Sequence, residues 1–360
     1  MAKPRIEYFF SARDDSSPRP QPLGDGRVDF HELGLIENVV VGQVLARIPP
    51  GEEGGGPEAF PMGENVYVPK ENPRVLVAAV NGHVFWKDGK IHVSPVYVVE
   101  GDVDFSTGNV VFVGRLVVKG SIRAGFKVRA QELLVEGDVE GADIKVGEGM
   151  EVKGGVIGGE KGRVECGGLK AMYALGAKVE AKGDVVLEKS SRNSVILAEG
   201  EIRVEGDPGA IIGGEVRAAR GIKARWVGAR WGIPTEVVVG MNPFWEDELR
   251  SLRGRKEELT KEFRELKARL RYLQDQRGNF EREELTRRLK EIKGKFEEVS
   301  RREQILEAKL REGEGKVWVR EGIYHGVSLR IGDVSHTLRE DIRGKWVFYS
   351  NGKQIKYRAW

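Results

Sequence analysis

The side chains best placed for chemistry in this sequence are acidic and recur at one position of a repeated phrase. Asp102, Asp138 and Asp184 each follow a glycine and precede a valine. If the repeats stack, these carboxylates could form a ladder suited to carbohydrate cleavage. Lys119 and Lys153 intervene in the same stack. We therefore expect a solvated charged face rather than a catalytic ladder.

The histidines and the cysteine give no spacing typical of a catalytic or metal site. None of the five histidines lies within the repeats. His83 and His92 flank an Asp88-Gly89 turn signal, so we expect an ordinary cross-strand pair that faces across a hairpin rather than a zinc site. The single cysteine, Cys166, excludes an internal disulfide framework and favours a reducing compartment. We expect it to be a small buried apolar residue.

Motifs for nucleotide binding or hydrolysis are absent from the sequence. It contains no GxxxxGK[ST] loop, no GxSxG elbow, no HExxH and no CxxC. We therefore predict no catalytic residues, no cofactor and no metal.

The balance of charge argues neither for nor against a nucleic-acid partner, and the residue patterns lead us to expect no nucleic-acid partner and no membrane insertion. Lys and Arg number 59 against 56 Asp and Glu, a net charge of +3. Basic residues crowd positions 217–230 together with Trp226, and Trp231 follows. For these residues we favour a capping coil whose tryptophans cover the end of the fold over a single-stranded nucleic-acid site. No run approaches the 18 apolar residues of a membrane span.

The acidic positions belong to a short repeat that organises the chain. Its first four phrases begin at Val99, Val118, Val135 and Val152, with spacings of 19, 17 and 17 residues. Apolar and polar residues alternate in each phrase, which indicates a strand with one buried face. So short a repeat, rich in Val and Gly, predicts a mainly β fold: a single-stranded, right-handed β-helix whose coils bury their apolar faces against each other. The repeat glycines are Gly101, Gly120, Gly137 and Gly154.

Composition divides the chain into five segments. They are a flexible N-terminal segment (1–24), a small N-terminal β domain (25–95), the β-helix (96–245), an antiparallel coiled-coil hairpin (246–312) and a C-terminal β segment (313–360) that packs near the end of the β-helix. Asn81-Gly82, Asp88-Gly89 and the sequence 350–353 read as hairpin turns. The end coils would be open sheet edges, so we expect the flanking segments to cap them.

The helical segment shows apolar residues at alternating spacings of three and four, typical of a coiled-coil seam. Residues 277–279 break it into two helices, each about 45 Å long. Lys256 and Glu303 are the charged seam positions, and a diagonal pair between them would fix the register. The predicted seam comprises Leu252, Lys256, Leu259, Phe263, Leu266, Leu289, Ile292, Phe296 and Glu303.

Several stretches, in order along the chain, resemble the bacterial flagellar assembly protein A family, a β-helical group with a coiled-coil insertion. They are 41–50, 101–110 with Gly114, 125–130, 212–214 and 235–243. The most specific stretch contains Asp102, Asp104, Ser106, Thr107, Gly108 and Asn109. The match covers about residues 25–345, and bactofilin-type polymer-forming β-helices are a more distant likeness. The resemblance implies a role in flagellar assembly or placement and no established catalytic activity.

We therefore expect a cytoplasmic, non-enzymatic scaffold or adaptor. The β-helix would be a rigid body, and the hairpin would dock a protein partner, such as a flagellar or polar-localisation factor, or a second copy of the chain. Two alternatives stay open. The first is a polymer-forming cytoskeletal β-helix. The second is an enzyme, either carbohydrate-active or an acyltransferase, although the repeat lacks a strict hexapeptide period and contains no histidine.

Overall fold

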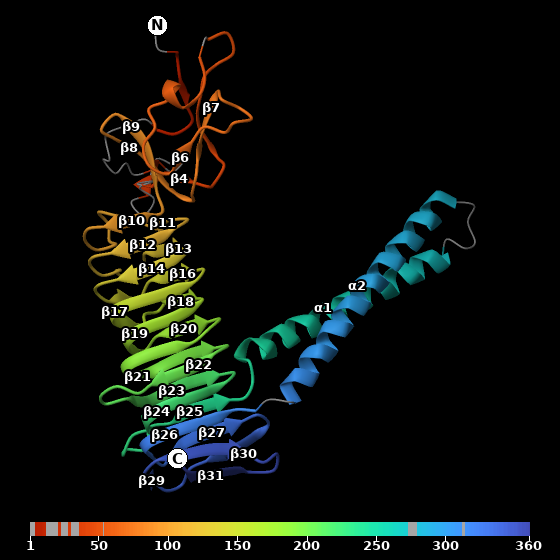
Figure 1. The fold of residues 1–360 in the computed structure, drawn as a ribbon. Coiled ribbons are helices and arrows are strands. Elements are labelled where there is room, and N and C mark those ends of the chain that lie inside the picture. The colour runs from red at the N-terminus through yellow and green to blue at the C-terminus, as the bar shows by residue number, and fades with distance from the viewer. Residues whose placement is uncertain are drawn as a thin grey trace.

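The computed structural model of this chain describes residues 4–11, 21–22, 28–29, 36–52, 54–272, 279–311 and 314–360. A small β domain forms one end, a long β-solenoid forms the body, and a helical hairpin projects from the body near its other end (Figure 1). The predicted fold class is confirmed as a mainly β chain with a β-solenoid, a small N-terminal β domain and an inserted helical segment.

The N-terminal domain has its own apolar core and two small sheets. One sheet has the order β1 (Glu7–Tyr8), β5 (Val44–Arg47), β7 (Val75–Ala78), β6 (Val66–Tyr67), and the other has β4 (Asn38–Val39), β8 (Gly82–Lys87), β9 (Lys90–Ser94). The 3-10 helix η1 (Pro57–Ala59) and the pair β2 (Gln21–Pro22) and β3 (Val28–Asp29) complete it.

Two sequence expectations for this domain differ from the structure. A flexible segment was expected over 1–24, but β1 pairs with β5 and Phe10 is only 8% exposed, so this part is packed into the domain. Residues 12–20 lie outside the described part of the chain. Gly82 makes no hairpin turn: it lies in β8, where its Cα faces the Ser94 carbonyl too closely for a side chain.

Each coil of the solenoid contributes to three faces, and strands on one face pair in parallel with those of the next coil. Face 1 contains β10 (Val96–Val99), β12 (Arg115–Val118), β14 (Glu132–Val135), the starts of β17 (Gly149–Ile157), β19 (Gly168–Leu175) and β21 (Val185–Ala198), then β22 (Glu201–Val204), β24 (Gly221–Val227) and β26 (Lys316–Ile323). Face 2 contains β15 (Val139–Glu140) and the continuations of the longer strands. Face 3 contains β11 (Val110–Val111), β13 (Lys127–Ala130), β16 (Asp143–Val146), β18 (Arg163–Cys166), β20 (Lys178–Ala181), the end of β21, β23 (Ala210–Ala218), β25 (Thr235–Val239) and β27 (Val327–Ile331).

Alternate residues of these strands point inward and stack into one continuous core. Val103, Ile122 and Val139 occupy one inward position in successive coils, and each is at most 1% exposed. The core runs from Val99 in the first coil to Phe348 beyond the last. The alternation in the sequence is therefore the alternation between core and surface.

The repeat glycines are required where consecutive coils touch. A Cβ at Gly120, Gly137 or Gly154 would overlap the side chain or backbone of the preceding coil. Gly101 belongs to the first coil, and a Cβ there would meet nothing within 4 Å. The glycine column thus reports coil-to-coil contact.

The helical hairpin, α1 (Pro243–Tyr272) and α2 (Asn279–Arg311), is inserted between β25 and β26. The predicted seam residues are buried or half-buried, while most of their neighbours are exposed. Lys256 Nζ lies 2.7 Å from Glu303 Oε2, the pair expected to fix the register. Arg277 and Gly278, part of the predicted break, lie outside the described residues.

Residues after the hairpin do more than pack near the end of the solenoid, because β26 and β27 form its last coil. The chain then folds back in antiparallel strands: β28 (Val334–Thr337) pairs with β27, while β29 (Ile342–Arg343) and β30 (Trp346–Ser350) pair with β26. β31 (Ile355–Ala359) pairs with β30 through the predicted turn at 350–353. The last parallel coil is therefore capped.

The N-terminal domain caps the other end. Asn38 Nδ2 donates a hydrogen bond to the Val111 carbonyl (2.8 Å), and its Oδ1 accepts one from the Val113 N–H (3.0 Å). Ile36 packs against the solenoid core. The expectation that flanking segments cap the coils thus agrees with the contacts at both ends.

Candidate functional site

The recurring carboxylates are built into the backbone of the solenoid. Asp102 Oδ1 accepts the Ser121 N–H at 2.8 Å, Asp138 Oδ1 accepts the Gly155 N–H at 2.6 Å, and Asp184 Oδ1 accepts the Glu201 N–H at 2.9 Å. Each bond links one coil to the next. These side chains therefore join neighbouring coils rather than forming a merely solvated face, and no residue pattern indicates the backbone donors.

Their electrostatics agree with this role. The Ser121 N–H and then the Arg123 guanidinium hold the pKa of Asp102 below its ordinary value. Arg123 also reaches Glu140 at 2.9 Å, which extends the ion pair over a further coil. Asp102 is therefore a charged acceptor between coils rather than a proton donor.

The family-like stretch forms a corner of the first coil. Asp104 Oδ1 accepts hydrogen bonds from the Ser106 N–H (2.8 Å) and hydroxyl (2.6 Å), and Thr107 Oγ1 donates to the Asp102 carbonyl (2.8 Å). Gly108 has a φ of +70°, which favours glycine. Asn109 Oδ1 accepts the Lys127 N–H of the next coil at 2.8 Å. The structure thus gives each polar residue of the stretch a partner in this corner.

His83 and His92 do not face each other. Phe85 is the cross-strand partner of His92 and stacks between the two imidazoles, with ring centroids 5.6 Å from each. Each Nδ1 accepts a backbone N–H, from Glu37 at 3.2 Å and from Glu64 at 3.1 Å respectively. Burial lowers the pKa of His83, so its neutral form is favoured.

Cys166 and the two tryptophans also have structural surroundings. Cys166 belongs to the solenoid core, and burial there raises the pKa of its thiol to about 12. The neutral thiol therefore packs as a small apolar side chain. Trp226 stacks on Tyr324 of the last coil at 5.5 Å. Trp231 is 85% exposed, so it does not cover the solenoid end as expected. The reason is that the end is built from residues after the hairpin, which makes the basic stretch the coil before it.

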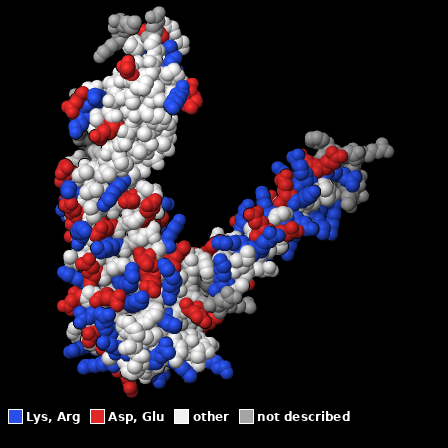
Figure 2. Space-filling view, in the orientation of Figure 1, with Lys and Arg blue, Asp and Glu red and all other residues white. Residues whose placement is uncertain are grey.

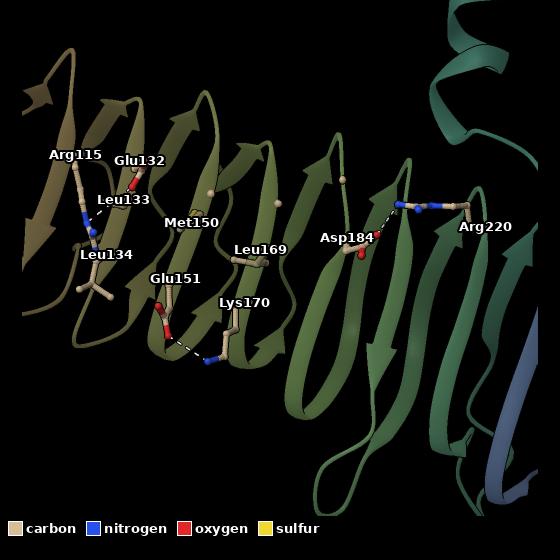
Figure 3. Close-up of a pocket in the computed structure, with 13 residues that line it drawn as sticks. Arg115, Glu132, Leu133, Leu134, Met150, Glu151, Leu169, Lys170, Asp184 and Arg220 are labelled. Carbon is tan, nitrogen blue, oxygen red and sulfur yellow. Dashed lines mark hydrogen bonds and ion pairs between the residues drawn. The ribbon is translucent and has the colours of Figure 1, made fainter. Parts of the chain in front are cut away.

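A groove of about 580 Å³ runs along face 1 (Figure 3). Gly149 and Gly168 leave it open in adjacent coils. Its carboxylates are matched with cations: Glu132 with Arg115 (3.9 Å), Glu151 with Lys170 (3.3 Å) and Asp184 with Arg220 (2.8 Å). The groove therefore offers charged pairs but no isolated acid–base pair of the kind hydrolysis uses.

The arm is fixed to the body at its base. The chain enters the hairpin after Gly240 and returns from it before Gly315. The two glycines are in contact there, and the backbone of Gly240 leaves no space for a side chain at Gly315. Asn242 Oδ1 accepts the Phe244 N–H at 3.0 Å at the start of α1. Phe244 lines a crevice of about 330 Å³ against the solenoid that also contains Lys145 and Glu165.

The described part of the chain contains neither a cluster of metal ligands nor a membrane-spanning helix. No group of three or more His, Cys, Asp and Glu side chains there could hold a metal ion. None of its helices is both long enough and apolar enough to span a bilayer.

The chain matches two protein-family models. Residues 95–355 match the model described as the Flagellar Assembly Protein A beta solenoid domain, and residues 2–56 match the model of the Flagellar Assembly Protein A N-terminal region. Comparisons with curated proteins and with solved structures return no match.

Proposed function

Because the chain belongs to the flagellar assembly protein A family, we propose that it acts as a non-enzymatic scaffold in flagellar assembly. In this proposal the solenoid is a rigid body in the cytoplasm. The helical hairpin is the arm that docks a protein partner.

The observation that carries the proposal is the arm itself. It leaves the solenoid between two consecutive coils and extends well beyond the body (Figure 1). Its α1 has 30 residues and α2 has 33, which is about 45–50 Å of helix. Its seam residues are buried or half-buried between the two helices and none belongs to the solenoid core, so the arm adds surface without adding to that core.

The surface of the arm suits recognition by another protein. Acidic and basic side chains intermingle along it (Figure 2). Two apolar residues outside the seam are exposed: Ile305 on α2 at 42% and Tyr272 at the end of α1 at 70%. The mixed charges favour a protein partner over a nucleic acid, which would require a basic face. Two separate apolar residues are ordinary on a protein surface and add nothing to this argument.

The rigidity of the body supports the same conclusion. The core is continuous and the outer ion pairs join neighbouring coils, for example Lys119 with Glu136 at 3.0 Å and Arg163 with Glu180 at 2.7 Å. Such a rod would hold the arm at a fixed distance from the N-terminal domain.

Replacing residues 244–311 by a short Gly-Ser linker tests the proposal in flagellated cells that carry the variant in place of the intact chain. We expect the solenoid to fold and accumulate normally, with loss of flagellar filaments and swimming.

The matched control replaces the same residues with an unrelated antiparallel helical hairpin of equal length. It should fail to restore filaments if the surface of the arm docks a partner. Normal filament numbers with the Gly-Ser linker, or full rescue by the unrelated hairpin, would show that the arm has no docking role.

A further inference from the structure

The C-terminal cap leaves one strand edge without a partner. β31 pairs with β30 along one side, and no described strand pairs along its other side. Four of its five residues are exposed, with only Ile355 half-buried. An open edge presents backbone N–H and C=O groups to which another extended segment can bind.

The surface around this edge is basic. Residues 342–360 contain five Lys or Arg and no Asp or Glu. Lys and Arg side chains are prominent at this end of the solenoid (Figure 2). The stretch 217–230 is equally basic, but its Arg220 and Lys223 pair with acidic side chains of other coils, Asp184 and Glu201. The cap is therefore distinguished by basic side chains that lack such pairs among the described residues.

The outer face of β31 lacks the ion pairs that the solenoid makes between neighbouring strands. Lys223 on β24 reaches Glu201 on β22 at 3.0 Å, whereas Lys356 lies opposite Tyr349 and Arg358 lies opposite Val347. Arg358 lies over the Tyr349 ring at 5.9 Å. No acidic partner of Lys356 or Arg358 occurs among the described residues, so the complementary position is the one beyond the edge.

The inner face of the same strand continues the core. Tyr357 contacts Trp346 and Phe348, with ring centroids 5.2 Å and 5.4 Å away, and Phe348 belongs to the solenoid core. Tyr357 itself is 51% exposed. Apolar side chains of an added strand would cover it, just as each coil covers the one before.

We propose that the free edge of β31 binds an extended segment of a partner protein in which acidic and apolar residues alternate. The acidic residues would pair with Lys356 and Arg358, and the apolar residues would pack over Tyr357. This site goes beyond the proposed function because it does not involve the arm.

A second copy of the chain is a poor occupant of this edge. Antiparallel pairing of two β31 strands would set Lys and Arg against Lys and Arg, and like charges on paired strands are destabilising. Basic residues on edge strands also prevent aggregation in many proteins. The test must therefore distinguish an edge that repels every added strand from an edge that binds an acidic strand.

The test uses the full chain and a fluorescein-labelled synthetic peptide, Gly-Glu-Val-Glu-Tyr-Glu-Gly, with blocked ends. We expect saturable binding by fluorescence anisotropy and slower hydrogen exchange at the β31 amides. A peptide with Lys in place of Glu should not bind. The double variant Lys356→Glu with Arg358→Glu should weaken binding about tenfold or more, because two favourable pairs become repulsive.

Matched controls identify the edge. Lys127→Glu with Lys178→Glu reverses two exposed lysines on face 3, and its binding should equal that of the unmodified chain. An acidic peptide N-methylated at alternate backbone nitrogens should lose binding, since it cannot form the ladder. Deleting the arm should leave binding unchanged, so failure here and failure of the proposed function are distinguishable.

Three results would overturn the proposal. They are equal binding of the N-methylated peptide, equal binding by the Lys356 and Arg358 variant, or tighter binding of oligo-dT or phosphatidylglycerol vesicles that the same variant abolishes. The last would make the cap a general polyanion surface rather than a strand-binding edge.

Discussion

In the sequence, Asp102, Asp138 and Asp184 are candidates for a ladder of catalytic carboxylates. In the fold, they join one coil to the next. Each carboxylate accepts a backbone N–H from the following coil. A buried or half-buried N–H without an acceptor is destabilising. Each carboxylate accepts the N–H of the residue that directly follows a glycine in the next coil, and that glycine allows the two coils to lie close together. At the scale of single residues, the repeat is explained by hydrogen bonding and space.

The pKa of Asp102 makes one of these bonds testable. Because the pKa is lowered in the folded state, the carboxylate contributes stability above its unfolded pKa, near 4, and that contribution is lost as the pH falls through the folded pKa. Asp102→Asn should lower the thermal midpoint at pH 7, and the difference from the unmodified chain should shrink toward pH 3. Calorimetry at the two pH values measures this, and a pH-independent difference would contradict the assignment.

The glycine column gives a second residue-scale prediction. Gly137→Val should destabilise the solenoid by about 1–3 kcal/mol or more, because the side chain would overlap Ser121 and the Gly120 backbone. Gly149→Val is the matched control, since a Cβ there meets nothing within 4 Å. Denaturant unfolding of both variants checks the prediction. Equal loss of stability in the two would show that space between coils is not the cause.

At the scale of elements, the hairpin was the part most readable from sequence. A heptad seam depends on the spacing of residues within each helix, and folding the chain back at the turn sets which seam positions lie opposite each other. The sequence alone therefore predicts the pair Lys256 and Glu303, which the structure contains. Asp88-Gly89 likewise predicted the β8–β9 turn, where both residues have positive φ. Asn81-Gly82 is the same kind of turn signal but forms no hairpin turn, because Gly82 lies in β8 in close contact with Ser94 on β9.

The elements that sequence could not predict depend on contacts between distant segments. The packing of β1 depends on its pairing with the distant strand β5, and Trp231 is exposed because the last coil follows the hairpin. The groove on face 1 depends on coil register, because only that register places Gly149 beside Gly168. The open side of β31 likewise follows from the order of the strands, because β31 pairs only with β30 among the described strands.

Separate packing of arm and body predicts separate unfolding. Leu266→Asp with Ile292→Asp places charges in the seam and should abolish most of the helical circular-dichroism signal. The β body should keep its thermal transition, because no seam residue belongs to the solenoid core. The control, Arg264→Asp with Arg288→Asp, changes exposed positions on the same helices and should retain the helices. Loss of the β transition in the seam variant would show that the arm is part of the core.

At the scale of the whole molecule, the caps bear on whether the chain polymerises. A coil edge left open at either end would invite end-to-end pairing. Antiparallel strands instead cover β26 and β27, and Asn38 covers the first coil at Val111. These contacts argue against filaments built by stacking solenoids and favour a discrete molecule with a projecting arm.

The most direct test of this account compares the proteins captured by three forms of the chain from the same flagellated cells. The forms are the intact chain, the chain with residues 244–311 replaced by a linker, and the chain with an unrelated hairpin in their place. The intact chain should capture its partners in amounts that rise with the amount of chain used. We predict that both altered forms fail to capture these partners. Recovery of every partner by the form without the arm would contradict the claim that the arm is the docking site.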